Sequence, residues 1–173
     1  QGQTPGTLPD AVDLRQISGI GFRHGIDIVL NPPFWADSLD GLDRNALDKI
    51  DRHFYRRNKK AAITVVASRG CPFLCSYCAV SASSNYAKFR MRPVKDVLDE
   101  ITWQAGSKQV GFIDFEDENL TLKKSWVLAL LDGIKEIFKG EDIELRAMNG
   151  LFPPSLDKEI LTAMKAGGFK TLN

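Results

Sequence analysis

From residue 62 to the end of the chain, strand-like and helix-like segments alternate. Residues 62–67 form a near-continuous apolar run, which is typical of a strand buried on both faces. Residues 110–115 and 143–148 have a similar character, and residues 169–173 begin a fourth such run. Alternation of this kind implies right-handed crossovers and a parallel sheet with helices outside it. The predicted fold class is therefore α/β.

Three helices are predicted between these strands. Apolar residues recur at helical spacing over about 94–105. A second helix is predicted over 122–138, with Gly140 as its stop. The third helix should be capped by Ser155 and should end at the glycine pair 167–168.

The first sixty residues lack this alternation. Two short apolar segments flank residues 24–25, which predicts a β-hairpin near 20–30. A helix is predicted near 45–57, because apolar residues line one side of that segment.

All three cysteines of the chain lie within eight residues, at Cys71, Cys75 and Cys78. Clustered thiolates are typical metal ligands, and cysteine thiolates hold iron–sulfur clusters. Three cysteines on a four-iron cluster would leave one iron open, and an open metal position is what a substrate-binding centre needs. The spacing therefore predicts a 4Fe–4S cluster with one iron available to a small molecule.

Other uses of the three thiols fit the sequence less well. Structural zinc usually takes four ligands in close pairs, and His53, which could complete such a set, lies 18 residues before Cys71. A disulfide would leave one cysteine over. An electron-transfer cluster would need a fourth cysteine, which a partner chain could supply.

The spacing of these cysteines, with Tyr77 before the last one, resembles the cluster motif of the radical S-adenosylmethionine (radical SAM) superfamily. The flanking segments resemble one branch of it, whose members carry an upstream cobalamin-binding domain. The likeness runs from about residue 17 to the end of the chain. It is carried by residues 68–72, 90–94, 97–101, 115–121, 156–157 and 164–169.

The resemblance implies the architecture of a partial (β/α)6 barrel. Residues 61–173 would be the N-terminal half of the radical SAM domain, the front half of that barrel. Residues 1–60 would be the tail of the upstream domain and a linker that contains the hairpin and the helix.

The resemblance also implies the chemistry. The three cysteines would hold the cluster, and S-adenosylmethionine would chelate the open iron through its amino and carboxylate groups. One electron would then cleave the sulfonium and release a 5′-deoxyadenosyl radical. Cobalamin-dependent methyl transfer and ring rearrangement are the reactions considered, with cobalamin bound by an upstream domain, because this sequence has no Asp-x-His-x-x-Gly segment. The implied partners are a small-molecule substrate and a one-electron reductase or a donor of the flavodoxin or ferredoxin type.

Barrel active sites lie at the carboxyl ends of the strands, and polar residues follow the predicted strands here. Glu116, Asp117 and Glu118 are candidates to accept a hydrogen bond from the methionine ammonium, with Asp117 the first choice. Tyr77 is expected to contact the adenine, and Arg92 the methionine carboxylate. The alternatives are a solvated helix start for the acids, a core aromatic residue and a surface arginine.

Two other functions share these features. A tRNA methylthiotransferase has the same cysteine spacing but carries three further cysteines upstream, and residues 1–70 contain none. A non-catalytic iron–sulfur module would bind the cluster without S-adenosylmethionine. The basic run 52–60 is interpreted as a solvated helix face, so a nucleic-acid partner is not expected.

Composition adds few constraints. The net charge of +1 favours no class of partner. The sequence has no apolar run long enough to span a membrane and no signal-like start. Clustered thiolates persist in reducing surroundings, so the cytoplasm is the expected location.

Overall fold

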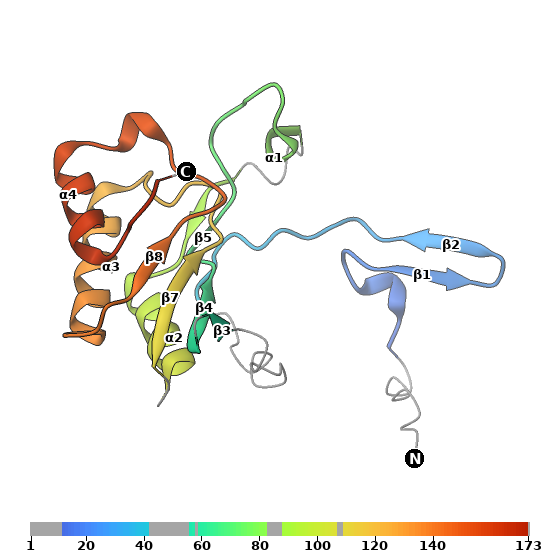
Figure 1. Ribbon diagram of the computed structural model, residues 1–173. Helices are drawn as coiled ribbons and strands as arrows, with labels where there is room; N and C mark the ends of the chain where they lie inside the picture. Colours follow the sequence, from blue (N-terminus) through green and yellow to red (C-terminus); the bar gives the residue numbers. More distant parts are fainter. Residues whose placement is uncertain (1–11, 42–55, 58, 83–87, 107–108, 173) are drawn as a thin grey trace, which may run out of the picture. The chain divides into compact units, whose positions relative to one another are not determined.

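The computed structural model describes residues 12–41, 56–57, 59–82, 88–106 and 109–172 (Figure 1). The chain divides into two compact units, residues 1–36 and residues 37–173. The predicted domain boundary at residues 60 and 61 falls within the second unit, and it stays a prediction.

The first unit is built on a β-hairpin. Strand β1 (Gly21–His24) pairs antiparallel with β2 (Asp27–Leu30), which confirms the hairpin predicted near 20–30. The connection is one residue later than predicted, with Gly25 at φ +64°. The side-chain amide of Asn31 donates to the carbonyl oxygens of Leu14 and Ile17, at 2.7 and 2.6 Å. These bonds attach the preceding turn to the hairpin.

The second unit contains the predicted parallel sheet. Strands β4 (Lys60–Val65), β7 (Val110–Phe115) and β8 (Glu144–Arg146) are parallel and lie in sequential order. A short strand, β3 (Arg56–Arg57), pairs antiparallel with the outer edge of β4. The helix predicted near 45–57 is therefore wrong at its last two residues, and residues 45–55 lie outside the described part of the chain.

Three helices accompany the sheet (Figure 1). They are α2 (Val94–Ala105), α3 (Lys124–Ile137) and α4 (Lys158–Gly167), each between two strand-like segments as predicted. A short helix that the sequence did not predict, α1 (Ala79–Ala82), follows the cysteines. Among the described residues, no helix is both long enough and apolar enough to cross a membrane.

The predicted cap of the third helix is wrong by two residues. Asp157, not Ser155, is the N-cap of α4, and its carboxylate accepts a hydrogen bond from the backbone N–H of Ile160 at 2.9 Å. Ser155 ends a 3-10 turn that begins at Pro153. Proline fixes its own backbone angle and suits the start of a helical turn, so the two adjacent prolines form a turn of their own before α4.

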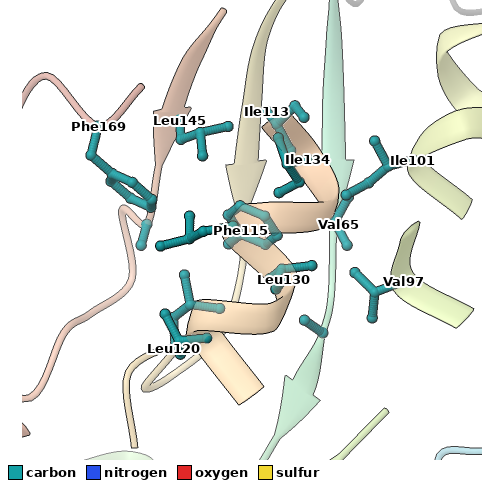
Figure 2. Packing of buried hydrophobic residues seen from close by; sticks show 14 of the residues in the cluster. Val65, Val97, Ile101, Ile113, Phe115, Leu120, Leu130, Ile134, Leu145 and Phe169 are labelled. Atoms are coloured by element: carbon teal, nitrogen blue, oxygen red, sulfur yellow. The ribbon is translucent and has the colours of Figure 1, made fainter. Parts of the chain in front are cut away.

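The core lies between the sheet and its helices. Strand side chains alternate between the two faces of the sheet, and those toward the helices are apolar and buried (Figure 2). Burying one such side chain stabilises the fold by about 1.5–3 kcal/mol. The strand residues of this face, each at most 1% exposed, are Ile63, Val65, Ile113, Phe115 and Leu145. They meet Val97 and Ile101 of α2 and Leu130 and Ile134 of α3.

The opposite face of the sheet is more polar. Asp114 and Arg146 are half-buried there, and the Arg146 guanidinium lies 5.0 Å from the ring centre of Phe112. The same guanidinium forms an ion pair with Glu144 at 2.7 Å. In a closed barrel this face would line the interior.

The fourth predicted strand is present only as one bridge. Phe169 makes a parallel bridge to Leu145, and no regular strand follows it within the described residues. A single bridge does not show how the sheet continues. The partial barrel therefore stays a prediction, whereas the α/β fold with a parallel sheet is confirmed.

Gly168 is expected to tolerate alanine poorly. Gly168 and Gly140 both have positive φ, but a Cβ on Gly168 would lie 2.5 Å from the carbonyl oxygen of Ile143, whereas one on Gly140 would meet nothing within 4 Å. Gly168→Ala should lower the free energy of unfolding by about 1–3 kcal/mol more than Gly140→Ala. Urea denaturation of the two variants measures the difference, and equal losses would contradict the close backbone approach.

Candidate functional site

The cysteine loop, residues 70–78, leaves the sheet through a short ribbon. Strand β4 ends at Val65, and after two residues the chain enters β5 (Ser68–Arg69). Strand β5 pairs antiparallel with β6 (Arg90–Met91), which lies just before α2. The strand predicted at 62–67 is therefore present as β4, which begins and ends two residues earlier than predicted. The ribbon holds both ends of the segment that contains the cysteines.

All three cysteines line one open hollow of about 930 Å³. Glu118 and Asn119, from the loop after β7, line the same hollow, as does Asn149 from the loop after β8. The carboxyl ends of parallel strands meet at one edge of a sheet. The prediction that the cysteine loop shares an edge with residues 116–119 is confirmed.

The donor set fits an iron–sulfur cluster. None of the cysteines forms a disulfide; Cys71 and Cys78 are half-buried and Cys75 is exposed. Among the described residues, no three His, Cys, Asp or Glu side chains are close enough to hold one metal ion. A cluster does not need that geometry, because each thiolate binds a different iron. Three thiols around one hollow therefore suit a cluster better than a single zinc ion.

The cysteine loop contacts both the loop after β7 and the loop after β8. The side-chain amide of Asn119 donates to the sulfur of Cys71 at 3.4 Å. The rings of Phe73 and Phe152 pack with their centres 4.2 Å apart. Neither contact was predicted from the sequence. Phe73 in the cysteine loop was the only signal in the sequence for the ring contact. Its partner, Phe152, is 79 positions away, so the sequence does not show that the two rings meet.

Asp117 is not among the residues that line the hollow. Its side chain is 0% exposed. One carboxylate oxygen accepts a hydrogen bond from the backbone N–H of Ala67 at 3.2 Å, and the other accepts one from the hydroxyl of Ser68. Burial raises the pKa of Asp117 to about 6, against the lowering effect of these hydrogen bonds. Asp117 was the first candidate for the contact with the methionine ammonium, but both of its carboxylate oxygens already accept hydrogen bonds within the protein.

The neighbouring acids are placed differently. Glu118 lines the hollow, and its Oε2 is buried without a hydrogen-bond partner in the described part of the chain. Its Oε1 lies 4.0 Å from the Arg69 guanidinium. Glu116 accepts a hydrogen bond from the side-chain amide of Asn149 at 2.6 Å. Of the three acids, Glu118 is the one with an unused acceptor at the wall of the hollow.

Arg92 and Tyr77 occupy opposite environments. Arg92 is 5% exposed and forms an ion pair with Glu100 of α2 at 2.6 Å. Because it is buried, the surface-arginine alternative is wrong. Arg92 is not among the residues that line the hollow, and its contact with a methionine carboxylate stays a prediction. Tyr77 is 92% exposed and lines the hollow. The core-aromatic alternative for Tyr77 is therefore wrong, and its contact with adenine stays a prediction.

A second hollow, of about 970 Å³, lies at the other end of the strands. It is lined by residues 138–143, which precede β8, and by the residues that follow α4. It contains no cysteine, and active sites of this kind of sheet lie at the carboxyl ends of the strands. We therefore place the functional site at the cysteine hollow.

The chain is similar to known proteins in sequence and in fold. No family model matches the chain. An anaerobic magnesium-protoporphyrin IX monomethyl ester cyclase of Synechocystis is 33% identical over 116 residues, which are 65% of this chain and 22% of that protein. The corresponding cyclase of Rubrivivax gelatinosus is 40% identical over 117 residues, 65% of this chain and 20% of that protein.

Two further matches cover nearly the whole chain. An uncharacterised methyltransferase of Pyrococcus horikoshii is 26% identical over 165 residues, 92% of this chain and 34% of that protein. The solved structure of TsrM from Kitasatospora setae is a radical S-adenosylmethionine methyltransferase with cobalamin and a 4Fe–4S cluster bound. It matches with a TM-score of 0.63 and 18% identity over 93% of this chain and 33% of that chain.

The resemblance to the radical SAM superfamily is confirmed. The branch with an upstream cobalamin-binding domain stays a prediction, because cobalamin is named only for TsrM, and that match shows a shared fold. The chain spans about a fifth to a third of the length of the curated relatives it matches. At its low identity the TsrM match shows a shared fold. What these proteins bind and do is carried to this chain only as a proposal.

The pKa of Asp117 predicts a pH-dependent stability. Folding raises this pKa from the ordinary 3.8 to about 6, so between these values the folded chain holds a proton that the unfolded chain has lost. The stabilisation that the raised pKa of Asp117 gives to the folded state is therefore greatest below the unfolded pKa, and it is lost as the pH rises through 6. The free energy of unfolding of the wild type, relative to Asp117→Asn, should fall by about 1 kcal/mol between about pH 5 and about pH 7.5.

Urea denaturation of the cluster-free protein over this pH range measures that difference. The cluster-free protein is used because loss of the cluster in acid would also change the stability with pH. A wild-type advantage that grew with pH would contradict a raised pKa.

Proposed function

We propose that this chain is part of a radical SAM enzyme that reductively cleaves S-adenosylmethionine at a 4Fe–4S cluster to start radical chemistry. The observation that carries the proposal is the position of Cys71, Cys75 and Cys78 around one hollow at the carboxyl ends of parallel strands. The family resemblance supports it independently. The cofactors are the cluster and S-adenosylmethionine.

Different residues of the hollow would bind the cluster, adjust its potential and exclude water. The three thiolates would each hold one iron, and when bound the cluster supplies the electron that breaks the sulfonium bond. Asn119 donates a hydrogen bond to the sulfur of Cys71, and such bonds help to set the potential of a cluster. The packed rings of Phe73 and Phe152 would keep water from one side of the hollow.

Glu118 is the acid best placed to receive the methionine ammonium. It lines the hollow, and one of its oxygens is buried without a hydrogen-bond partner among the described residues. A cationic ammonium is the partner that such a carboxylate lacks. Glu116 is the second candidate, because its bond to Asn149 holds it at the same edge. Tyr77, exposed beside the cysteines, would contact the adenine.

The reaction that follows would be cobalamin-dependent methyl transfer or a ring-forming rearrangement of a small molecule. The methyltransferase and cyclase relatives support these two classes. Cobalamin would be bound by a domain outside this chain, and an electron donor of the flavodoxin or ferredoxin type would reduce the cluster. A non-catalytic module is separated from these enzymes by titration with S-adenosylmethionine, because a cluster without an open iron would give no spectral change.

Each cysteine should be indispensable for the cluster. Anaerobic reconstitution of the intact protein should give about four irons per chain, and Cys71→Ala, Cys75→Ala or Cys78→Ala should each abolish the cluster spectrum, because no spare cysteine can replace the lost ligand. Ser76→Ala is the matched control: Ser76 is exposed in the same loop and carries no thiol. Iron analysis and visible absorption give the result. A stable four-iron cluster in the Cys75→Ala variant would contradict the assignment.

Glu118→Gln should weaken S-adenosylmethionine binding while the cluster stays intact. A hydrogen bond to a charged group contributes about 1.5–3 kcal/mol, so the dissociation constant should rise by roughly tenfold to a hundredfold. The measurement is the change in the cluster spectrum as S-adenosylmethionine is added to the intact protein. Glu141→Gln, at an exposed position away from the hollow, serves as the control. Wild-type affinity in both Glu118→Gln and Glu116→Gln would exclude these acids as the ammonium site.

A further inference from the structure

Residues 66–68 join β4 to β5 and lead directly into the cysteine loop, with Cys71 three residues further on. This connection has no strand partner of its own at Val66 and Ala67. Buried backbone groups outside regular structure need other partners. Here those partners come from two buried charged residues, Asp117 and Arg92.

The Asp117 carboxylate holds one side of the connection. It accepts hydrogen bonds from the backbone N–H of Ala67 and from the Ser68 hydroxyl, and a further bond from the Ser68 backbone N–H. Ala67, Ser68 and Asp117 are all at most 1% exposed. A buried carboxylate is unfavourable unless it is well hydrogen-bonded, and these three donors are what offset its burial.

Arg92 holds the other side. Its backbone N–H donates to the carbonyl oxygen of Ala67 at 2.9 Å, and its guanidinium donates to that of Val66, also at 2.9 Å. The guanidinium is in turn fixed by Glu100 of α2, and the Arg92 carbonyl accepts a hydrogen bond from Trp126 of α3. The connection is thus fixed to the helices on one side and to the loop after β7 on the other.

We propose that Asp117 is a positioning residue for the cysteine loop: by fixing Ala67 and Ser68, it sets where Cys71 enters the hollow. It therefore acts on the cluster without touching it or S-adenosylmethionine. The loop that contains Asp117 also contains Asn119, which bonds to the Cys71 sulfur. Movement of residues 66–68 would therefore change both the position of Cys71 and its hydrogen bond with Asn119. The effect on the cluster rests on the proposed function, whereas the effect on the loop does not.

The first test uses the cluster-free intact protein. In Asp117→Asn an amide NH₂ replaces one acceptor oxygen, so one of the three donors loses its partner. Hydrogen–deuterium exchange of the peptides covering 66–78 should rise by about tenfold or more, which corresponds to about 1.4 kcal/mol. Asp132→Asn makes the same chemical change at an exposed position of α3, and should leave these peptides unchanged. Wild-type exchange at 66–78 in Asp117→Asn would overturn the proposal.

Ser68→Ala is the second variant, in case Asp117→Asn does not fold. It removes only the hydroxyl donor and leaves both backbone bonds. A smaller rise in exchange, confined to 66–78, is expected. If Asp117→Asn is unfolded, unchanged exchange in Ser68→Ala overturns the proposal.

The second test uses the protein with its cluster. Asp117→Asn should alter the electron paramagnetic resonance spectrum of the reduced cluster before any S-adenosylmethionine is added. It should also weaken S-adenosylmethionine binding by about 10–100-fold, as changes to groups that orient metal ligands do. A wild-type spectrum combined with weakened binding would make Asp117 a direct ligand and overturn the positioning role. If the wild type forms no four-iron cluster, the proposed function fails, and the exchange experiment still decides the role of Asp117 in the loop.

Discussion

The parallel pairing of β4 with β7 is the constraint on which the site depends. It brings Ala67 and Asp117, 50 positions apart in the sequence, within one hydrogen bond of each other. Because both strands run the same way, the loops that leave them emerge at one edge of the sheet. The cysteine loop and the acidic segment are therefore neighbours for a reason of topology. Addition of β8 beside β7 brings Asn149 to the same edge.

Buried charge is concentrated just below this edge. Asp117, Arg92 and Glu100 are all less than 9% exposed, and each has a polar partner. Replacement of buried ion pairs by apolar residues often leaves stability unchanged or raises it, so stability alone does not explain these residues. Their donors and acceptors fix an irregular connection that apolar side chains could not hold. The proposed positioning of the cysteine loop would account for them.

Two residues that line the hollow are open to a ligand: Glu118 keeps an acceptor that no described residue uses, and Tyr77 is almost fully exposed. Asp117 does not line the hollow, and both of its carboxylate oxygens accept hydrogen bonds within the protein. This division separates residues that could meet a cofactor from residues that hold the loops in place.

The sequence by itself determined the parallel α/β order and the three helices, because these depend on local periodicity, and its cysteine spacing predicted the ligand set of the proposed cluster. It misplaced the cap of α4 and the end of the helix near 45–57, where prolines and an edge strand override local preference. Only the tertiary structure distinguishes the environments of Glu116, Asp117 and Glu118. Adjacent acids look alike in sequence, but successive side chains point in different directions. Burial then commits Asp117 to Ala67 and Ser68 and leaves Glu118 at the hollow.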